Sequence, residues 1–390
     1  MSVLVSQSWA GSKVIKKGTR PDALYPALEV LPMSRYATAV KPNNTVKTGE
    51  PKFVGIDYAK KFSYMTVGDK DGNVLRQEPV RNDLAMLEQF FEPYPKLTVA
   101  IEACRGHEWL VDWLREKKYT VHVGNVYAIK QIAQSRCKTD KIDSRILMEL
   151  LAKDFLPTTY QPTKKERNYR ELLRWRAQLV KSQTQYKLRV HALLDKENKG
   201  ISYPFSTAGR EAIKDVKLDG QRDAILIESL EVIDFLDKQI YDQEKKIRRL
   251  AKSNPDAYRI KSIPGFDVLT AMVFVAEVGD VTRFRNAEQL TAFTGLVPRV
   301  YSSGGTTNTG KITKTGPRLL RRMLVQSAWA AVRSCPVLRS RFASISRRRG
   351  KKKAIIAIAR MLAEIAYHVY KEKTPFDETR LGAGLVRDFV

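Results

Sequence analysis

The sequence has few cysteines, no histidine pair with metal-ligand spacing and no long apolar run. Its three cysteines, Cys104, Cys137 and Cys335, are odd in number and far apart, which indicates neither a disulfide framework nor a zinc site of thiolates. The longest apolar runs, 271–276 and 354–359, are much shorter than the roughly 18–20 apolar residues of a membrane-spanning helix. The first residues lack the apolar block of a signal peptide. We therefore expect a cytoplasmic protein with no membrane partner.

Acidic residues are scarce relative to basic ones. The 390 residues include 42 Asp and Glu against 69 Lys and Arg, a formal net charge of +27, and the isoelectric point is about 9.9. Apolar residues at 43% and charged residues at 28% are typical of a folded protein. Because such an excess of positive charge repels itself unless a polyanion neutralises it, nucleic acid is the first partner to expect. An acidic membrane surface is the alternative, and the short apolar runs disfavour it.

The length corresponds to about two to three domains. We expect an extension, three domains and a tail, at residues 1–50, 51–157, 158–252, 253–376 and 377–390. The extension is polar and interrupted by four prolines, so we expect it to be poorly ordered or loosely docked.

The first domain is rich in short β-type runs. Three runs come first, and further runs then alternate with helical patterns, an order that predicts a mixed α/β sheet. The expected strands are 53–57, 62–67, 74–80, 97–102 and 120–123. The expected helices are about 82–92, 108–117 and 126–133.

After about residue 141 the strand signal nearly vanishes, which predicts helical middle and last domains. Two apolar tracks with seven-residue spacing are Leu172, Leu179, Tyr186 and Leu193, and Leu226, Ile233, Ile240 and Ile247. They predict a central antiparallel hairpin or coiled coil, with two ordinary packed helices as the alternative. In the last domain, helices are expected at about 286–295, 317–334 and 353–372. The turn at 263–267 looks like that of a helix-hairpin-helix, or is a plain Pro-Gly turn.

Four carboxylates of the first domain occupy positions where side chains can meet. Asp57 and Glu102 each end an apolar strand, and Asp140 and Asp143 open a helix on one face, three residues apart. Four converging acids repel one another unless a hard cation neutralises them, and Mg²⁺ prefers oxygen ligands. Two such ions about 3.5–4 Å apart would clamp the attacking and leaving oxygens of a phosphoryl transfer. The alternative is that each acid caps its element or is solvated.

The last domain contains a long stretch without acids. Between Glu288 and Glu364 there is no Asp or Glu, whereas 16 Lys and Arg occupy the 75 intervening positions. A solvated surface normally mixes both signs, so we interpret this stretch as a phosphate-contacting surface. We expect a hydrophilic loop over 299–308 that leads into a helix. The basic residues of the loop and helix start are Arg299, Lys311, Lys314, Arg318, Arg321 and Arg322. A serine of this loop is a nucleophile only if neighbours activate it, and the alternative is a flexible turn.

Several of these motifs, in this order, resemble the IS110 family of insertion-sequence transposases, the RNA-guided bridge recombinases. The resemblance runs from about residue 53 to residue 376. Its markers are Gly55-Ile56-Asp57, Ile101-Glu102-Ala103, Lys138-Thr139-Asp140-x-x-Asp143-x-Arg145, Ser262-Ile263-Pro264-Gly265, Phe293-x-Gly295-Leu296-x-Pro298-Arg299 and Ser303-Gly304. Residues 1–50 have no counterpart in this pattern, and Ala-Cys-Arg-Gly follows Glu102 where family members usually have Ala-Thr-Gly.

The resemblance implies a fold, a site and partners. It implies an RNase H-like (RuvC-like) N-terminal domain in which Asp57, Glu102, Asp140 and Asp143 bind Mg²⁺. It implies a helical C-terminal domain whose Ser303, the serine that directly precedes a glycine, attacks DNA and becomes joined to it. In the family a structured guide RNA pairs with donor and target DNA, and tetramers, as dimers of dimers, combine the acids of one subunit with the serine of another. A nucleoid-associated protein of a bacterium or archaeon is implied.

Our leading hypothesis is therefore a transposase that cuts and rejoins DNA through a Ser303 phosphodiester. The acids would hold Mg²⁺, and the basic residues of the loop and helix start would engage the DNA or RNA backbone. One alternative is a metal-dependent, resolvase-type endonuclease in which Ser303 is incidental. The other is a non-catalytic RNA-binding scaffold assembled by the coiled coil.

Overall fold

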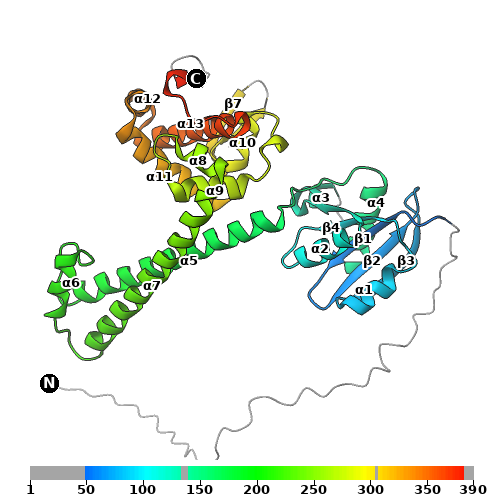
Figure 1. Ribbon diagram of the computed structural model, residues 1–390, viewed down its shortest axis with the longest axis horizontal. Helices are drawn as coiled ribbons and strands as arrows, with labels where there is room; N and C mark the ends of the chain where they lie inside the picture. Colours follow the sequence, from blue (N-terminus) through cyan, green and yellow to red (C-terminus); the bar gives the residue numbers. More distant parts are fainter. Residues whose placement is uncertain (1–48, 133–138, 304–305, 382–390) are drawn as a thin grey trace, which may run out of the picture. The chain divides into compact units, whose positions relative to one another are not determined.

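A computed structural model describes residues 49–132, 139–303 and 306–381 of the chain (Figure 1). The backbone divides into two compact units, Met1–Thr159 and Tyr160–Val390. Nearly all of the predicted extension and the end of the predicted tail, 382–390, lie outside the described residues. Within the described ranges, no helix is both long enough and apolar enough to cross a membrane.

The first unit is built on one five-stranded mixed sheet, which confirms the predicted α/β class. Its strands are β1 (Phe53–Tyr58), β2 (Phe62–Gly68), β3 (Val74–Arg81), β4 (Thr98–Glu102) and β5 (Thr120–Gly124). The order across the sheet is β3-β2-β1-β4-β5. The first three strands are antiparallel neighbours, whereas β1, β4 and β5 run parallel, so their carboxyl ends share one edge.

Four helices cover the two faces of this sheet. They are α1 (Leu84–Phe91), α2 (Glu108–Glu116), α3 (Val126–Ile132) and α4 (Asp140–Ala152). Because side chains alternate along a strand, Ile56 and Ile101 face the core that contains α1 and α2, whereas Ala100 faces α3 and α4. Gly55 also faces α4, where a side-chain carbon would lie 2.0 Å from the carbonyl oxygen of Ser144. Helix α4 therefore rests directly on β1.

The second unit begins with a long helical hairpin (Figure 1). Helices α5 (Lys164–Asp195) and α7 (Gln221–Lys252) have 32 residues each, pack along one another and are linked through α6 (Thr207–Lys214). Of the predicted tracks, all four members on α7 are buried, as are Leu179 and Leu193 on α5. The hairpin is thus observed, and its supercoiling stays a prediction.

The rest of the second unit is a helical bundle around α9 (Val268–Val278), which is buried throughout from Thr270 onward. Its other helices are α8 (Pro255–Lys261), α10 (Ala287–Thr294), α11 (Arg318–Ser334), α12 (Pro336–Arg349) and α13 (Lys351–Glu372), with short 3₁₀ turns at Val281–Arg283 and Glu378–Leu381. The three helices predicted here are confirmed as α10, α11 and α13. In the turn before α9, Gly265 has φ of +80° and approaches Ser327 so closely that an added side-chain carbon would lie 2.2 Å from its carbonyl oxygen. That packing requires the glycine.

The prediction of a loop over 299–308 is wrong, because the described backbone there forms two paired strands. Strands β6 (Pro298–Ser303) and β7 (Thr306–Ile312) pair antiparallel, with Ser303 opposite Thr306. The cause is visible in the sequence: β-branched and aromatic residues recur on both sides of the dipeptide Gly304-Gly305, a hairpin pattern whose polar side chains make it look like a loop.

Candidate functional site

Asp57 and Glu102 lie next to each other at the carboxyl edge of the sheet. Parallel pairing joins Ile56 of β1 to Ile101 of β4, so the two acids are the next residues on neighbouring strands. Neighbouring strands are about 4.8 Å apart. Each acid follows a residue that faces α1 and α2, and therefore faces the opposite side, toward α4. Both side chains are half-buried.

Helix α4 begins with the other two predicted acids. The Thr139 hydroxyl caps the helix by accepting a hydrogen bond from the Ile142 backbone N–H at 3.3 Å. Asp140, which is exposed, and Asp143, which is half-buried, both lie in the first turn. A carboxylate there is also stabilised by the positive end of the helix dipole, so the position alone does not define a site.

Two pKa shifts report the negative charge that these acids create. Burial, followed by the charges of Glu102 and Asp57, raises the pKa of the Cys104 thiol to about 11. Burial, followed by the charges of Asp140 and of Glu78 on β3, raises the pKa of Tyr64, which is the direct partner of Asp57 across the β1–β2 pair. Acids from β1, β4 and α4 thus act on neighbouring groups at one edge.

The donor set fits Mg²⁺ in chemistry, because it consists of carboxylate oxygens on adjacent elements. In the part of the chain that the structure describes, however, no three His, Cys, Asp or Glu side chains are gathered closely enough to hold a metal ion. The structure therefore shows the shared edge and face, and the ligation itself stays a prediction.

The segment after Glu102, where the sequence departs from the family pattern, is tied to the same edge. His107 Nδ1 lies 2.5 Å from the carbonyl oxygen of Cys104, and Trp109 Nε1 donates to the hydroxyl of Tyr58 at 3.0 Å. The Tyr58 and Trp109 rings also meet edge to face, with centroids 6.5 Å apart. Tyr58 directly follows Asp57, so these contacts hold the backbone on both sides of the edge. Sequence reasoning missed this pair, although its adjacency to Asp57 was a usable signal.

Ser303 belongs to the second unit and the four acids to the first. Its backbone ends β6 opposite Thr306 of β7, and its side chain lies outside the described residues. Of the six predicted basic contacts, five have exposed side chains: Arg299, Lys311, Lys314, Arg318 and Arg322.

Arg321 differs from the other five basic residues. Its Nη1 donates to the carbonyl oxygens of Thr294 at 3.1 Å and Thr315 at 2.8 Å. Burial, followed by the charge of Arg318, lowers its pKa. The guanidinium thus connects the end of α10 to the segment after β7, which is a positioning role.

Comparison with known families gives two matches along the chain. A family described as "Transposase", of the DEDD type found in IS110, matches residues 54–198, and the "Transposase IS116/IS110/IS902 family" matches residues 257–343. The first match covers the four acids, and the second covers the hairpin and its basic residues.

Individual relatives extend the similarity over most of the chain. The chain is 27% identical to the transposase for insertion sequence element IS1328 of Yersinia enterocolitica, over 83% of this chain and 98% of that protein. It is 27% identical to the transposase for insertion sequence element IS1111A of Coxiella burnetii, over 81% of this chain and 88% of that protein. It is also 27% identical to the pilin gene-inverting protein of Moraxella lacunata, over 72% of this chain and 82% of that protein.

Proposed function

The chain belongs to the IS110 family of transposases, enzymes that cut and join DNA, and we propose that it does so with two groups of its own residues. One group is Asp57, Glu102, Asp140 and Asp143 in the first unit. The other is Ser303 in the second. The observation that carries the proposal is the pairing of β1 with β4, which makes Asp57 and Glu102 neighbours at one edge of the sheet, on the face that α4 covers. The sheet order with its antiparallel first three strands supports an RNase H-like fold for this unit.

Ser303 supplies the nucleophile in this proposal. Its hydroxyl gives up a proton, its oxygen bonds to a DNA phosphorus and one bridging P–O bond breaks, which leaves a phosphoserine and a free DNA hydroxyl. The reverse reaction with a different DNA end rejoins the strand without an external energy source. The four carboxylates would hold Mg²⁺, which supplies positive charge to the reacting phosphate when bound.

The exposed basic residues around the hairpin orient the strand. Arg299 and Lys311 lie on β6 and β7, and Arg318 and Arg322 lie in the first two turns of α11. Cations at these positions bind phosphate oxygens on either side of a reacting bond without reading sequence.

We extend the proposal to the partners. A structured guide RNA pairs with donor and target DNA, and the protein acts in the cytoplasm, at the nucleoid, as a dimer of dimers joined through a coiled coil of α5 and α7. The net charge of +27 supports a large nucleic-acid partner. The division of the acids and Ser303 between two compact units is compatible with a site shared by two subunits.

Covalent trapping tests the chemistry. Wild-type protein incubated with labelled donor DNA and Mg²⁺, then denatured, should retain label. Ser303→Ala should lose that adduct, while Ser302→Ala, its neighbour on β6, should keep it. Metal-dependent cleavage that survives Ser303→Ala would instead favour the endonuclease alternative. Unchanged activity of Asp57→Ala and Asp143→Ala would favour the scaffold and contradict the proposal.

Sequencing the nucleic acid that copurifies with the protein tests the guide RNA. A discrete RNA encoded beside the gene is the expected result. Random cellular RNA would contradict RNA guidance and leave the trapping result to stand on its own.

A further inference from the structure

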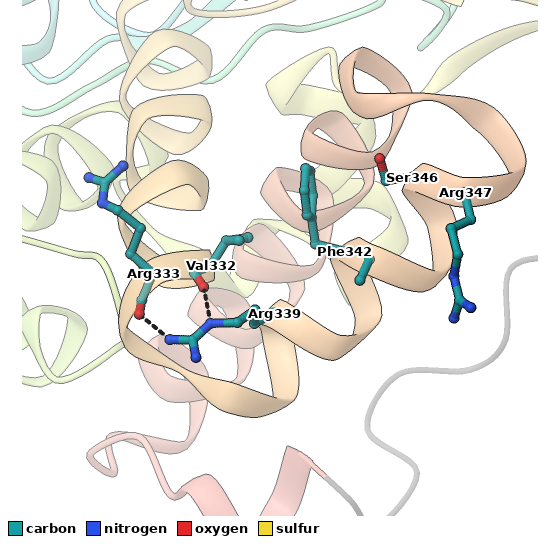
Figure 2. A pocket seen from close by; sticks show the side chains of 7 residues that line it. Val332, Arg333, Arg339, Phe342, Ser346 and Arg347 are labelled. Atoms are coloured by element: carbon teal, nitrogen blue, oxygen red, sulfur yellow. Dashed lines mark hydrogen bonds between the residues drawn. The ribbon is translucent and has the colours of Figure 1, made fainter.

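An open groove of about 620 Å³ lies between α11 and α12, and none of its lining residues belongs to the two groups in the proposed function. Its walls include Val332 and Arg333 at the end of α11, and Phe342, Ser346 and Arg347 on α12. Figure 2 shows Phe342 between Arg333 on one side and Arg347 on the other. The groove thus combines an aromatic ring with a cation on each side.

The groove is held open by contacts of its own. Arg339 donates from Nε to the carbonyl oxygen of Val332 at 3.1 Å, and from Nη2 to that of Arg333, which joins α12 to the last turn of α11 (Figure 2). Phe342 packs edge to face against Trp329 of α11, with ring centroids 5.6 Å apart, and the Trp329 side chain remains 40% exposed. The aromatic wall is therefore preformed.

The cations beside the groove form no ion pair with the carboxylates of the described residues. Arg347, Arg348 and Arg349 end α12, and three lysines, 351–353, begin α13 after Gly350. All six side chains and that of Arg333 are exposed, and none of them forms an ion pair within the described part of the protein. Such a cluster repels itself until a polyanion neutralises it.

We propose that this groove binds an unpaired nucleotide of a nucleic-acid strand. The base lies against Phe342, the flanking phosphates contact Arg333 and Arg347, and the strand continues along the cations at 348–353. The base must be unpaired, because the bases of a duplex are stacked on one another and present only their edges. The inference rests on the proposed function only in taking nucleic acid as the partner, and it adds where and in which form the strand binds.

Equilibrium binding tests this assignment with matched variants of the full chain. The probes are a short labelled single-stranded DNA, the RNA of the same sequence and the DNA duplex, followed by fluorescence anisotropy across a salt series. The charge variant is Arg333→Gln with Arg347→Gln. Its control is Lys238→Gln with Lys245→Gln, which removes two exposed charges from α7, where acids are interspersed. The ring variant is Phe342→Leu, which keeps apolar volume.

The charge variant should lower the slope of log affinity against log salt for single strands by about 1.4, since each lost phosphate contact contributes about 0.7. Phe342→Leu should weaken single-strand binding about fivefold or more with the slope unchanged, and should leave duplex binding near wild type. Whichever single strand, DNA or RNA, loses more affinity in these variants is the strand that the groove binds. Equal effects of the charge variant and its control, or equal effects of Phe342→Leu on single strand and duplex, would overturn the proposal. The proposal would also be overturned if a poly-glutamate peptide displaced the labelled single strand as effectively as an unlabelled oligonucleotide does.

This readout involves no cleavage, so it can fail while covalent trapping through Ser303 succeeds, and the reverse. If Phe342→Leu lowers the melting temperature, the salt slope of the charge variant still tests the proposal. Arg333 and Arg347 are exposed and form no ion pair in the described structure, so their replacement should leave the fold intact.

Discussion

Replacing Gly55 by alanine should move α4 together with the two carboxylates at its start. The added carbon would lie 2.0 Å from the carbonyl oxygen of Ser144 and 2.5 Å from the backbone nitrogen of Met148. Non-bonded atoms need about 3.5 Å, so the helix must retreat from β1 by roughly 1.5 Å. Both obstructing atoms belong to the backbone, so no side-chain rotation relieves the contact.

The displacement should cost activity more than stability. Overpacking of this kind costs about 1–3 kcal/mol, which leaves most molecules folded if the unit has an ordinary stability of about 5–15 kcal/mol. A misplacement of about 1 Å between reacting groups costs about 100-fold in rate. Gly55→Ala should therefore reduce DNA cleavage by about two orders of magnitude, because Asp140 and Asp143 move away from Asp57.

Cleavage rates and hydrogen exchange of the α4 amides measure the two effects separately. Gly200→Ala is the matched control, since its added carbon meets nothing nearer than the Asp195 carboxylate at 3.9 Å, and it should behave like wild type. Faster exchange in α4 with wild-type cleavage would refute the role of the α4 acids. Unchanged exchange in α4 would refute the packing argument itself.

Three further predictions test single residues. Because the pKa of the Cys104 thiol is raised to about 11, its alkylation should be slow at neutral pH and should accelerate as the pH approaches that value, as measured by peptide mass spectrometry. Glu102→Gln removes a negative charge beside the thiol and should shift this acceleration to lower pH. Fast alkylation of the wild-type thiol at neutral pH would contradict its buried, acidic environment. Glu277 is 2% exposed, receives the Arg174 guanidinium at 2.9 Å and lies 3.7 Å from the Arg170 guanidinium, whose side chain is 15% exposed. Glu277→Ala leaves the largely buried Arg170 charge unpaired and should lower the unfolding free energy of the second unit by about 3 kcal/mol; a loss under 1 kcal/mol in denaturant titration would contradict this role of Glu277. Lys311→Gln should reduce the slope of log affinity against log salt for duplex binding by about 0.9 and leave the melting temperature of the protein unchanged. Arg321→Gln should lower the melting temperature, because it weakens two hydrogen bonds to backbone carbonyls. The opposite pattern would show that Arg321 binds phosphate and that Lys311 supports the fold.

The sheet of the first unit was predictable almost strand by strand from the sequence. The expected strands at 53–57 and 62–67 correspond to β1 and β2, because these short runs are rich in β-branched and aromatic residues and are bounded by stretches that are not. The turn after β2 has a local cause as well: the Asp69 carboxylate accepts hydrogen bonds from the backbone nitrogens of Asp71 and Asn73. Local signals of this kind act within a few residues, so they survive without tertiary information.

The second unit shows where local signals fail. Helix α12 was not predicted, because Leu338 is its only buried residue within the described structure and its arginines give it no apolar stripe. The β6–β7 hairpin was taken for a loop because its side chains are polar. Both elements are positioned by neighbours: Arg339 ties α12 to α11, and the Thr313 backbone donates to Val297 beside the hairpin.

The candidate site was predictable in its residues and not in its geometry. Strand ends and a helix start locate Asp57, Glu102 and Asp143, but how closely their side chains approach depends on the seating of α4 upon Gly55, which no spacing in the sequence reveals. Arg321 makes the same point from the other unit. Its partners are carbonyl oxygens 27 and 6 residues away, so only the folded chain distinguishes it from the exposed cations around it.

Two clusters of unfavourable charge in the described residues are opposite in sign. Asp57 and Glu102 lie on neighbouring strands at the sheet edge of the first unit, and exposed cations that form no ion pair in the described structure lie beside the groove and Gly350 in the second. A folded protein gains stability by dispersing such charge, so its retention in both units indicates partners that arrive later. Under the proposed function, the phosphates of a nucleic-acid strand neutralise the cations, and Mg²⁺ would neutralise the acids.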